Sequence, residues 1–154
     1  MTSDSATGCS IVTVARQLTA VIKAQVPMNK IPEAERSARA TIDAVLPTLG
    51  AGTLRDTFTL WRPPEDGIMD MEAGTIVSRA FAPIGDVVPS AIPGGRTAHL
   101  LLVGPYDGLP GAWRTLFDWC GKEGLTLAGI NWQIYHEEKS DPSKVQTSLH
   151  ALLA

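Results

Sequence analysis

The stretch Ile92–Leu109, IPGGRTAHLLLVGPYDGL, joins two kinds of secondary structure. Within it, Arg96–Val103 includes four consecutive aliphatic residues and is typical of a strand. The Gly104-Pro105 pair ends this strand, because proline cannot continue its hydrogen bonding and glycine permits a sharp reversal. From Leu109 onward the apolar residues recur at helical spacing. The stretch therefore predicts a strand that turns directly into a helix.

The residues that follow complete a four-element module. The predicted helix carries Leu109, Trp113, Leu116, Phe117 and Cys120 on one face, a pattern that favours core packing. Residues 130–137 and 145–152 are predicted as two strands separated by a polar turn. The order is therefore strand, helix, strand, strand.

The same order is predicted upstream. Apolar and polar residues alternate from Ile11 to Val26, as in a half-buried strand, and a helical period follows after a proline-containing break. We predict a strand over 11–26, a helix over 34–49, strands over 57–62 and 68–81, and a connector over 82–89. The chain thus contains the module twice.

Residue-level similarity supports this repeat. Phe58–Trp61 occupies the place in the first half that Trp132–Tyr135 occupies in the second, and Thr41-Ile42-Asp43 lies near the same point of its helix as Thr115-Leu116-Phe117-Asp118, with Thr41 opposite Thr115. Each half is too small to bury its apolar face alone. We therefore predict one α+β domain over residues 1–154, with pseudo-symmetric halves at about 9–81 and 87–153.

Composition excludes several classes of function. The chain has 154 residues, of which 44% are hydrophobic and 19% charged, so a packed core is expected. The net charge is −3 without a basic stripe, which argues against nucleic acid as a partner. No secretory signal or membrane-spanning run is present, so we expect a cytoplasmic protein. Cys9 and Cys120 lack metal-site spacing and are expected to be reduced and inert.

The quoted stretch also resembles a known family signature. Ile92–Leu109, followed by Ala112-Trp113, Leu116 and Trp119, is similar to the GyrI-like small-molecule-binding family, which includes the effector-binding halves of AraC-type and MerR-type regulators. The similarity continues through Gly129–Tyr135 and the Asp141-Pro142 turn.

The resemblance implies a fold of two strand-helix-strand-strand modules that form a curved antiparallel sheet, with the helices on one side and a central ligand cleft. The regulators of the family carry a DNA-binding domain that this chain has no room for before its first strand, so a stand-alone member is expected. Such a member would bind flat hydrophobic or aromatic small molecules. The alternatives are a hydrolase of cyclopropane-bearing natural products and a protein-interaction role such as gyrase inhibition.

Gln133 is the residue at which this chain departs from the family pattern. The resemblance implies a glutamate here that points into the pocket and meets cationic ligands. Glutamine keeps the shape and loses the charge. We predict that Gln133 and Tyr135 face the cleft and that Trp132 and Ile134 face the helix layer. Repeat equivalence adds Thr59 and Trp61 to the ligand site.

The polar candidates for chemistry are few. Asp70, Glu72 and Tyr106 complete the predicted ligand-binding set, but no catalytic residue is assigned, because Gln133 cannot serve as an acid or base. His99, His136 and His150 are separated in the sequence and lack metal-ligand spacing, so no metal is predicted. No cofactor is predicted either.

Overall fold

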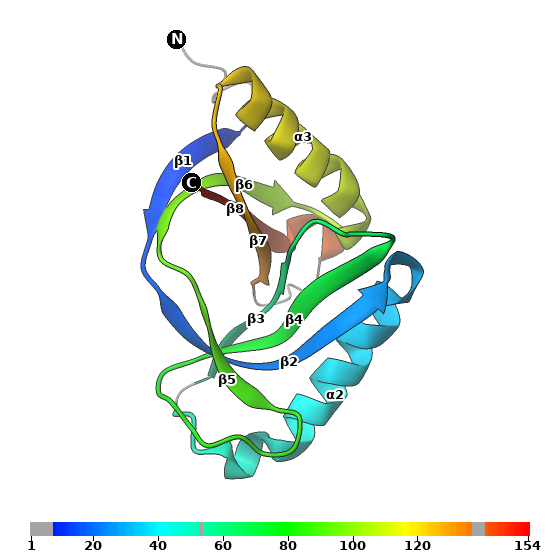
Figure 1. Cartoon of the computed structure of the whole chain (residues 1–154), viewed down its shortest axis with the longest axis vertical. Coiled ribbons are helices and arrows are strands. Elements are labelled where there is room, and N and C mark those ends of the chain that lie inside the picture. The colour runs from blue at the N-terminus through cyan, green and yellow to red at the C-terminus, as the bar shows by residue number, and fades with distance from the viewer. Residues whose placement is uncertain (1–7, 53, 137–140) are drawn as a thin grey trace. The chain divides into compact units, whose positions relative to one another are not determined.

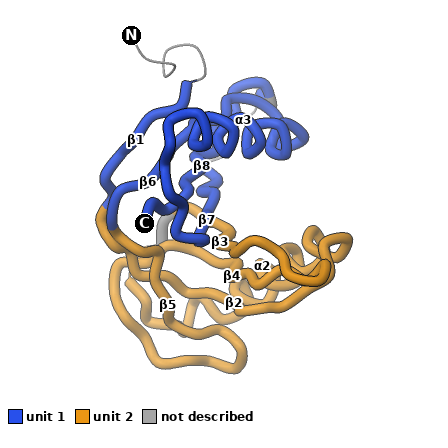
Figure 2. The backbone as a smooth tube through the Cα atoms, turned by 45° about the horizontal axis from the view of Figure 1, so that its top comes forward, with its two compact units in different colours: residues 1–14, 95–154 blue, residues 15–94 orange. Residues whose placement is uncertain are grey.

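The chain folds into two compact units, coloured separately in Figure 2. The structure is a computed structural model, and it describes residues 8–52, 54–136 and 141–154. Unit 2 is Ala15–Gly94, and unit 1 combines the chain up to Val14 with the chain from Gly95 onward. The chain therefore passes between the units twice.

Unit 2 is an antiparallel sheet with one helix (Figure 1). Its elements are β2 (Gln17–Pro27), α2 (Ile31–Leu49), β3 (Leu54–Trp61), β4 (Ile68–Val77) and β5 (Val88–Ile92). The strands lie in the order β3-β4-β2-β5. Helix α2 ends where Gly50 adopts a left-handed conformation, as expected for a glycine that closes a helix.

Unit 1 is built in the same way. Its elements are β1 (Cys9–Val14), β6 (Gly95–Val103), α3 (Leu109–Lys122), β7 (Leu127–Tyr135) and β8 (Gln146–Leu153). The strands are again antiparallel and lie in the order β7-β8-β6-β1. The strand after the helix lies at one end and the added strand at the other, as in unit 2. The predicted α+β class and the doubled strand-helix-strand-strand order are confirmed.

The prediction of one strand over residues 11–26 is wrong. The chain leaves the strand conformation at Ala15 and Arg16, so that β1 pairs with β6 and β2 pairs with β4 and β5. The predicted connector over 82–89 overlaps β5, which is an additional strand of unit 2. The boundaries of the units consequently differ from the predicted halves 9–81 and 87–153.

Helix α2 packs on one face of the unit 2 sheet. Ala38 of the helix forms a buried cluster with Met69, Met71 and Ala73 of β4. Ile42 belongs to a second buried cluster, which includes Ala20 of β2. The partly buried side chains against the first cluster include Ala34 of the helix and Trp61 of β3. Helix α3 likewise buries Trp113, Leu116, Trp119 and Cys120.

Candidate functional site

A chain of hydrogen bonds links α3 to β7 in unit 1. The indole Nε1 of Trp113 donates to Oε1 of Gln133 over 2.7 Å, and Nε2 of Gln133 donates to the Tyr135 hydroxyl over 2.7 Å. An indole N–H can only donate, so the amide oxygen of Gln133 must be the atom that faces Trp113. The orientation of the amide is thereby determined by its neighbours.

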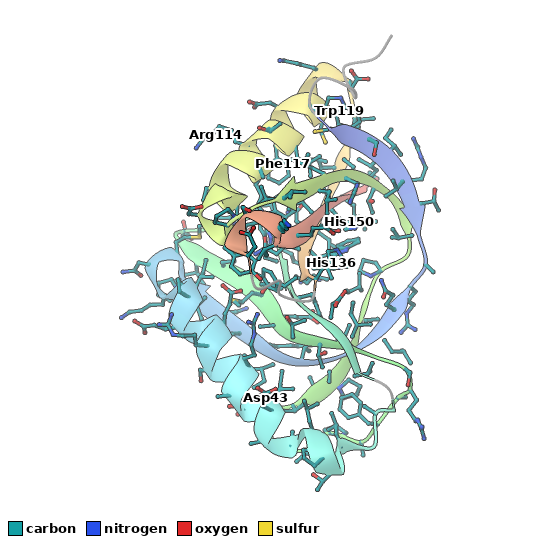
Figure 3. All side chains as sticks on the ribbon, turned by 180° about the vertical axis from the view of Figure 1, so that it is seen from behind. Asp43, Arg114, Phe117, Trp119, His136 and His150 are labelled. Atoms are coloured by element: carbon teal, nitrogen blue, oxygen red, sulfur yellow. The ribbon has the colours of Figure 1, made fainter. Side chains whose placement is uncertain are left out.

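Aromatic rings surround this chain of hydrogen bonds. The ring of Tyr106 meets Tyr135 edge to face at 5.6 Å, and Trp113 stacks on Phe117 at 5.4 Å. Tyr106 is 39% exposed, whereas Trp113 is only 8% exposed. Phe117 is labelled on α3 in Figure 3. We name Tyr106, Trp113, Phe117, Gln133 and Tyr135 the Gln133 cluster.

The predicted sidedness of β7 is wrong. Gln133 bonds to Trp113 of α3, so Gln133 and Tyr135 lie on the helix side of the strand and Trp132 and Ile134 on the other. Trp132 instead stacks on His150 at 5.4 Å. Alternation along a single strand separates two faces, but it does not say which of them a helix will cover.

The equivalent residues of β3 in unit 2 also lie on the helix side of their strand. Thr59 donates a hydrogen bond of 2.7 Å to Oε2 of Glu35 on α2, and Trp61 packs against the cluster that contains Ala34 and Ala38. Both side chains therefore lie on the helix side of β3. The structure thus brings Thr59 and Trp61 to one face in unit 2, and it brings Tyr106, Gln133 and Tyr135 together in unit 1. That Trp61 and Tyr135 line one cavity stays a prediction.

Asp70 and Glu72 lie on the opposite face of the unit 2 sheet. Trp61 is directly across from Met71, so the residues on either side of Met71 point away from the helix. Glu72 accepts a hydrogen bond of 2.6 Å from Ser90 of β5, and Asp70 is exposed. Asp70 and Glu72 do not share a face with Thr59 and Trp61, because each is one residue away from Met71 and successive residues of a strand point to opposite faces.

Trp113 and Phe117 are the two members of the cluster that the sequence assigned to core packing alone. Trp113 is buried as expected, and its indole N–H also donates to Gln133. A buried tryptophan generally needs an acceptor for this N–H. In the sequence, the neutral amide of Gln133 was the feature that indicated such an acceptor.

The three histidines are not isolated in the structure. His99 and His150 are direct cross-strand partners on β6 and β8, with ring centroids 4.8 Å apart. Nε2 of His136 lies 2.6 Å from the hydroxyl of Ser148. Burial, and then the neighbouring histidines, lower the pKa of His150 to about 4, and burial also lowers the pKa of His99. The register of β6 and β8 places His99 opposite His150, although the two residues are far apart in the sequence.

Neither thiols nor metals add chemistry to the described residues. Cys9 and Cys120 are buried and not disulfide-bonded, and burial raises the pKa of the Cys120 thiol, which disfavours the reactive thiolate. Within residues 8–52, 54–136 and 141–154, no group of three or more His, Cys, Asp or Glu side chains is arranged to hold a metal ion. None of the helices described is long and apolar enough to cross a membrane.

Comparison with known proteins agrees with this architecture. In the complex of EcmrR with DNA, EcmrR superposes with a TM-score of 0.81 at 20% identity over 94% of this chain, which spans 56% of the EcmrR chain. The C-terminal domain of EcmrR gives 0.77 at 19% identity, with 95% and 96% of the two chains covered. SAV2435 bound to tetraphenylphosphonium gives 0.73 at 14% identity, with 95% and 93% covered. These similarities establish a shared fold.

Family membership follows from the sequence match. No curated protein matches the chain. The family described as GyrI-like small molecule binding domain matches residues 8–149, which is nearly the whole length. The chain therefore belongs to the GyrI-like small molecule binding domain family.

Proposed function

We propose that this protein binds flat, largely apolar small molecules that carry a neutral hydrogen-bond acceptor, and that the Gln133 cluster contributes the binding surface. The observation that carries the proposal is the Trp113–Gln133–Tyr135 chain of hydrogen bonds. The rings of the cluster offer broad apolar faces of the kind that small-molecule sites use.

The amide of Gln133 sets the polarity of Tyr135. Because Nε2 can only donate, the oxygen of the Tyr135 hydroxyl accepts, and its proton is directed away from Gln133. A carboxylate at position 133 would reverse this bond, since the hydroxyl would then donate to it. Tyr135 makes a further contact within the protein, and a ligand that shares or displaces this contact at the hydroxyl meets a donor, which favours a carbonyl or ether oxygen.

This polarity distinguishes the chain from a cation receptor of the same fold. SAV2435 is bound to tetraphenylphosphonium, a cation with four aromatic rings. A desolvated carboxylate stabilises such a ligand by charge pairing, whereas an amide offers only a neutral hydrogen bond. We therefore infer that aromatic shape selection is retained here and that cation selection is weakened.

The Gln133→Glu variant tests the proposal. Its affinity for a planar cationic dye should rise by roughly five- to hundredfold, because a partly desolvated charge pair is worth about 1–3 kcal/mol. Its affinity for a neutral dye of the same shape should rise far less or fall. Titration of both dyes into both proteins, followed by fluorescence or calorimetry, measures the difference.

Gln146→Glu is the matched control, since it makes the same change at an exposed position of β8. This variant should change the affinity for both dyes little and by the same amount. Equal affinity shifts for the two dyes in Gln133→Glu would mean that residue 133 does not face the ligand, and the proposed site would be abandoned. Absence of neutral-dye binding by the unmodified protein would also overturn the proposal.

Mass spectrometry of a cyclopropane-bearing aromatic compound incubated with the protein tests the hydrolase alternative. None of the five members of the Gln133 cluster carries a carboxylate that could activate water, so the compound should be recovered unchanged. Time-dependent formation of a hydrolysed product would favour the enzyme instead.

A further inference from the structure

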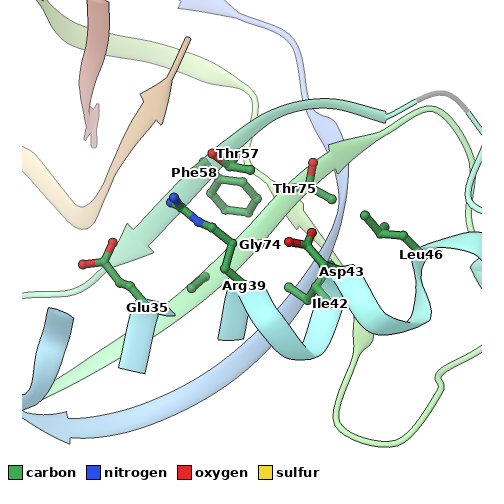
Figure 4. Close-up of a pocket in the computed structure, with 10 residues that line it drawn as sticks. Glu35, Arg39, Ile42, Asp43, Leu46, Thr57, Phe58, Gly74 and Thr75 are labelled. Carbon is green, nitrogen blue, oxygen red and sulfur yellow. The ribbon is translucent and has the colours of Figure 1, made fainter. Parts of the chain in front are cut away.

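A cavity of about 170 Å³ lies between α2, β3 and β4 of unit 2 (Figure 4). Its lining residues are Glu35, Arg39, Ile42, Asp43, Leu46, Thr57, Phe58, Ala73, Gly74 and Thr75. A cavity of roughly 150 Å³ accommodates benzene, whereas drug-sized ligands generally occupy about 300 Å³ or more. The volume therefore suits a compact organic molecule.

The cavity combines an apolar wall with charged groups. Ile42 is buried and Leu46 is partly buried, so the helix supplies the apolar side chains of the cavity. Phe58 lies between Thr57 and Thr59 on β3, so its side chain points to the other face of the sheet. Glu35, Arg39 and Asp43 follow one another at four-residue spacing on α2 and are drawn together with these residues in Figure 4. Residues at this spacing share one face of a helix.

The charged groups are held in different ways. Glu35 accepts the hydrogen bond from Thr59 over 2.7 Å. The Asp43 carboxylate makes no ion pair or hydrogen bond with any residue that the structure describes, although Arg39 is one helical turn away. A guanidinium has five N–H donors, so Arg39 can bind a carboxylate in addition to its other contacts.

The equivalent helix positions in unit 1 carry aromatic side chains. Ile42 and Leu116 are equivalent in the repeat, which makes Arg39 equivalent to Trp113 and Asp43 equivalent to Phe117. Trp113 and Phe117 stack on each other at 5.4 Å. Unit 2 carries two charged residues, Arg39 and Asp43, at the positions equivalent to this aromatic pair, and both line the cavity.

We propose that the unit 2 cavity is a second binding site, which takes a small zwitterion of the free amino acid type with an aliphatic side chain. Asp43 receives the ammonium group, Arg39 receives the carboxylate, and the side chain packs on Ile42 and Leu46. The two charges of an α-amino acid lie close together, and side chains one helical turn apart can converge on them, since their Cβ atoms are about 6 Å apart.

Calorimetric titration with three probes of one shape tests this site. Leucine carries both charges, leucinamide lacks the carboxylate, and 4-methylpentanoate lacks the ammonium group. Leucine should bind about tenfold more tightly than either analogue, because each analogue loses one charge-assisted hydrogen bond. Absence of leucine binding, or equal binding of all three probes, would overturn the proposal.

Two variants assign the charges to residues. Asp43→Asn should weaken the binding of leucine and leucinamide by roughly five- to tenfold and leave the binding of 4-methylpentanoate unchanged. Arg39→Gln should weaken leucine and 4-methylpentanoate but not leucinamide. Asp118→Asn, at an exposed position of α3, is the matched control and should change none of them. If Asp43→Asn leaves leucine affinity unchanged, the site is not the one described. Gln133→Glu should not alter leucine binding, so this test is independent of the proposed function.

Discussion

The Gly74→Ala variant is expected to lose roughly 3 kcal/mol of unfolding free energy, which corresponds to a fall of about 10 °C in melting temperature for a chain of this size. Gly74 lies on β4 between Val21 of β2 and Phe58 of β3. A Cβ atom added there would overlap the carbonyl oxygen of Ala20 and lie 2.8 Å from the Cα of Val21. Both are backbone atoms, so no side-chain rotation can relieve the overlap.

The effect should be large because the overlap involves paired strands. β2 and β4 pair from Thr19↔Ile76 to Pro27↔Ile68, and the buried residues of both strands support α2. Moving the β2 backbone away from position 74 lengthens hydrogen bonds and disturbs the packing beneath the helix. Overpacking of this kind costs about 1–3 kcal/mol when side chains can adjust, and backbone displacement belongs at the upper end.

Gly111→Ala is the matched control for this prediction. Gly111 lies in α3, and an added Cβ would meet nothing within 4 Å. This variant should gain roughly 0.5–1 kcal/mol, because alanine is favoured over glycine in helices. Urea unfolding of both variants gives the comparison. Unfolding free energies within about 0.5 kcal/mol of each other would contradict the close approach of β2 and β4 at Gly74.

Much of this fold could be predicted from local sequence patterns. The helical period over 34–49 predicted α2, which spans Ile31–Leu49, and the Gly104-Pro105 break correctly separated β6 from α3. These features depend on neighbouring residues alone. The repeat could be predicted as well, because each half carries the same succession of periods.

The break between β1 and β2 could not be predicted in this way. Apolar and polar residues alternate on both sides of Ala15 and Arg16, and neither residue is a glycine or a proline. β1 belongs to unit 1 because it pairs with β6, which lies more than 80 residues further along the chain. Periodicity contains no information about such a partner.

For the candidate site, sequence reasoning selected residues but not the face of the strand on which they lie. Gln133 and Tyr135 could be singled out from the sequence, and they are hydrogen-bonded to each other. Their position on the helix side, and the contact of Trp113 with Gln133, depend on which face of the strand α3 covers. The pairing of His99 with His150 likewise depends on the register of β6 and β8.

His150 should make the protein sensitive to mild acid. Its ring is 7% exposed and stacks on Trp132, and its Nδ1 lies 3.0 Å from the hydroxyl of Thr97. The hydroxyl also lies 3.3 Å from the carbonyl of Val12, and its single proton serves one of these two acceptors at a time. In either tautomer, acid must add a second proton to a ring that is buried beside His99.

The sign of the effect follows from the lowered pKa of His150. The unfolded chain takes up this proton near pH 6.5, whereas the folded protein resists it until about pH 4. The stabilisation from keeping His150 neutral is therefore complete above pH 6.5, and it is lost as the pH falls from 6.5 towards 4. The whole difference amounts to roughly 3 kcal/mol. His99, whose pKa is also lowered, adds to the loss in the same direction.

Urea unfolding between pH 7 and pH 4.5 measures this loss, and His150→Gln identifies its source. Glutamine has no proton to gain, so the variant should be less stable at pH 7, where it lacks the stacking on Trp132, and should lose much less stability on acidification. His136→Gln is the control, because burial is the first cause of the lowered pKa of His150 and is retained in this variant. It should keep most of the pH dependence of the unmodified protein. If His150→Gln and the unmodified protein lose stability in parallel between pH 6.5 and 4.5, His150 is not the acid-sensitive group, and the burial and hydrogen bonding described for it do not hold the ring neutral.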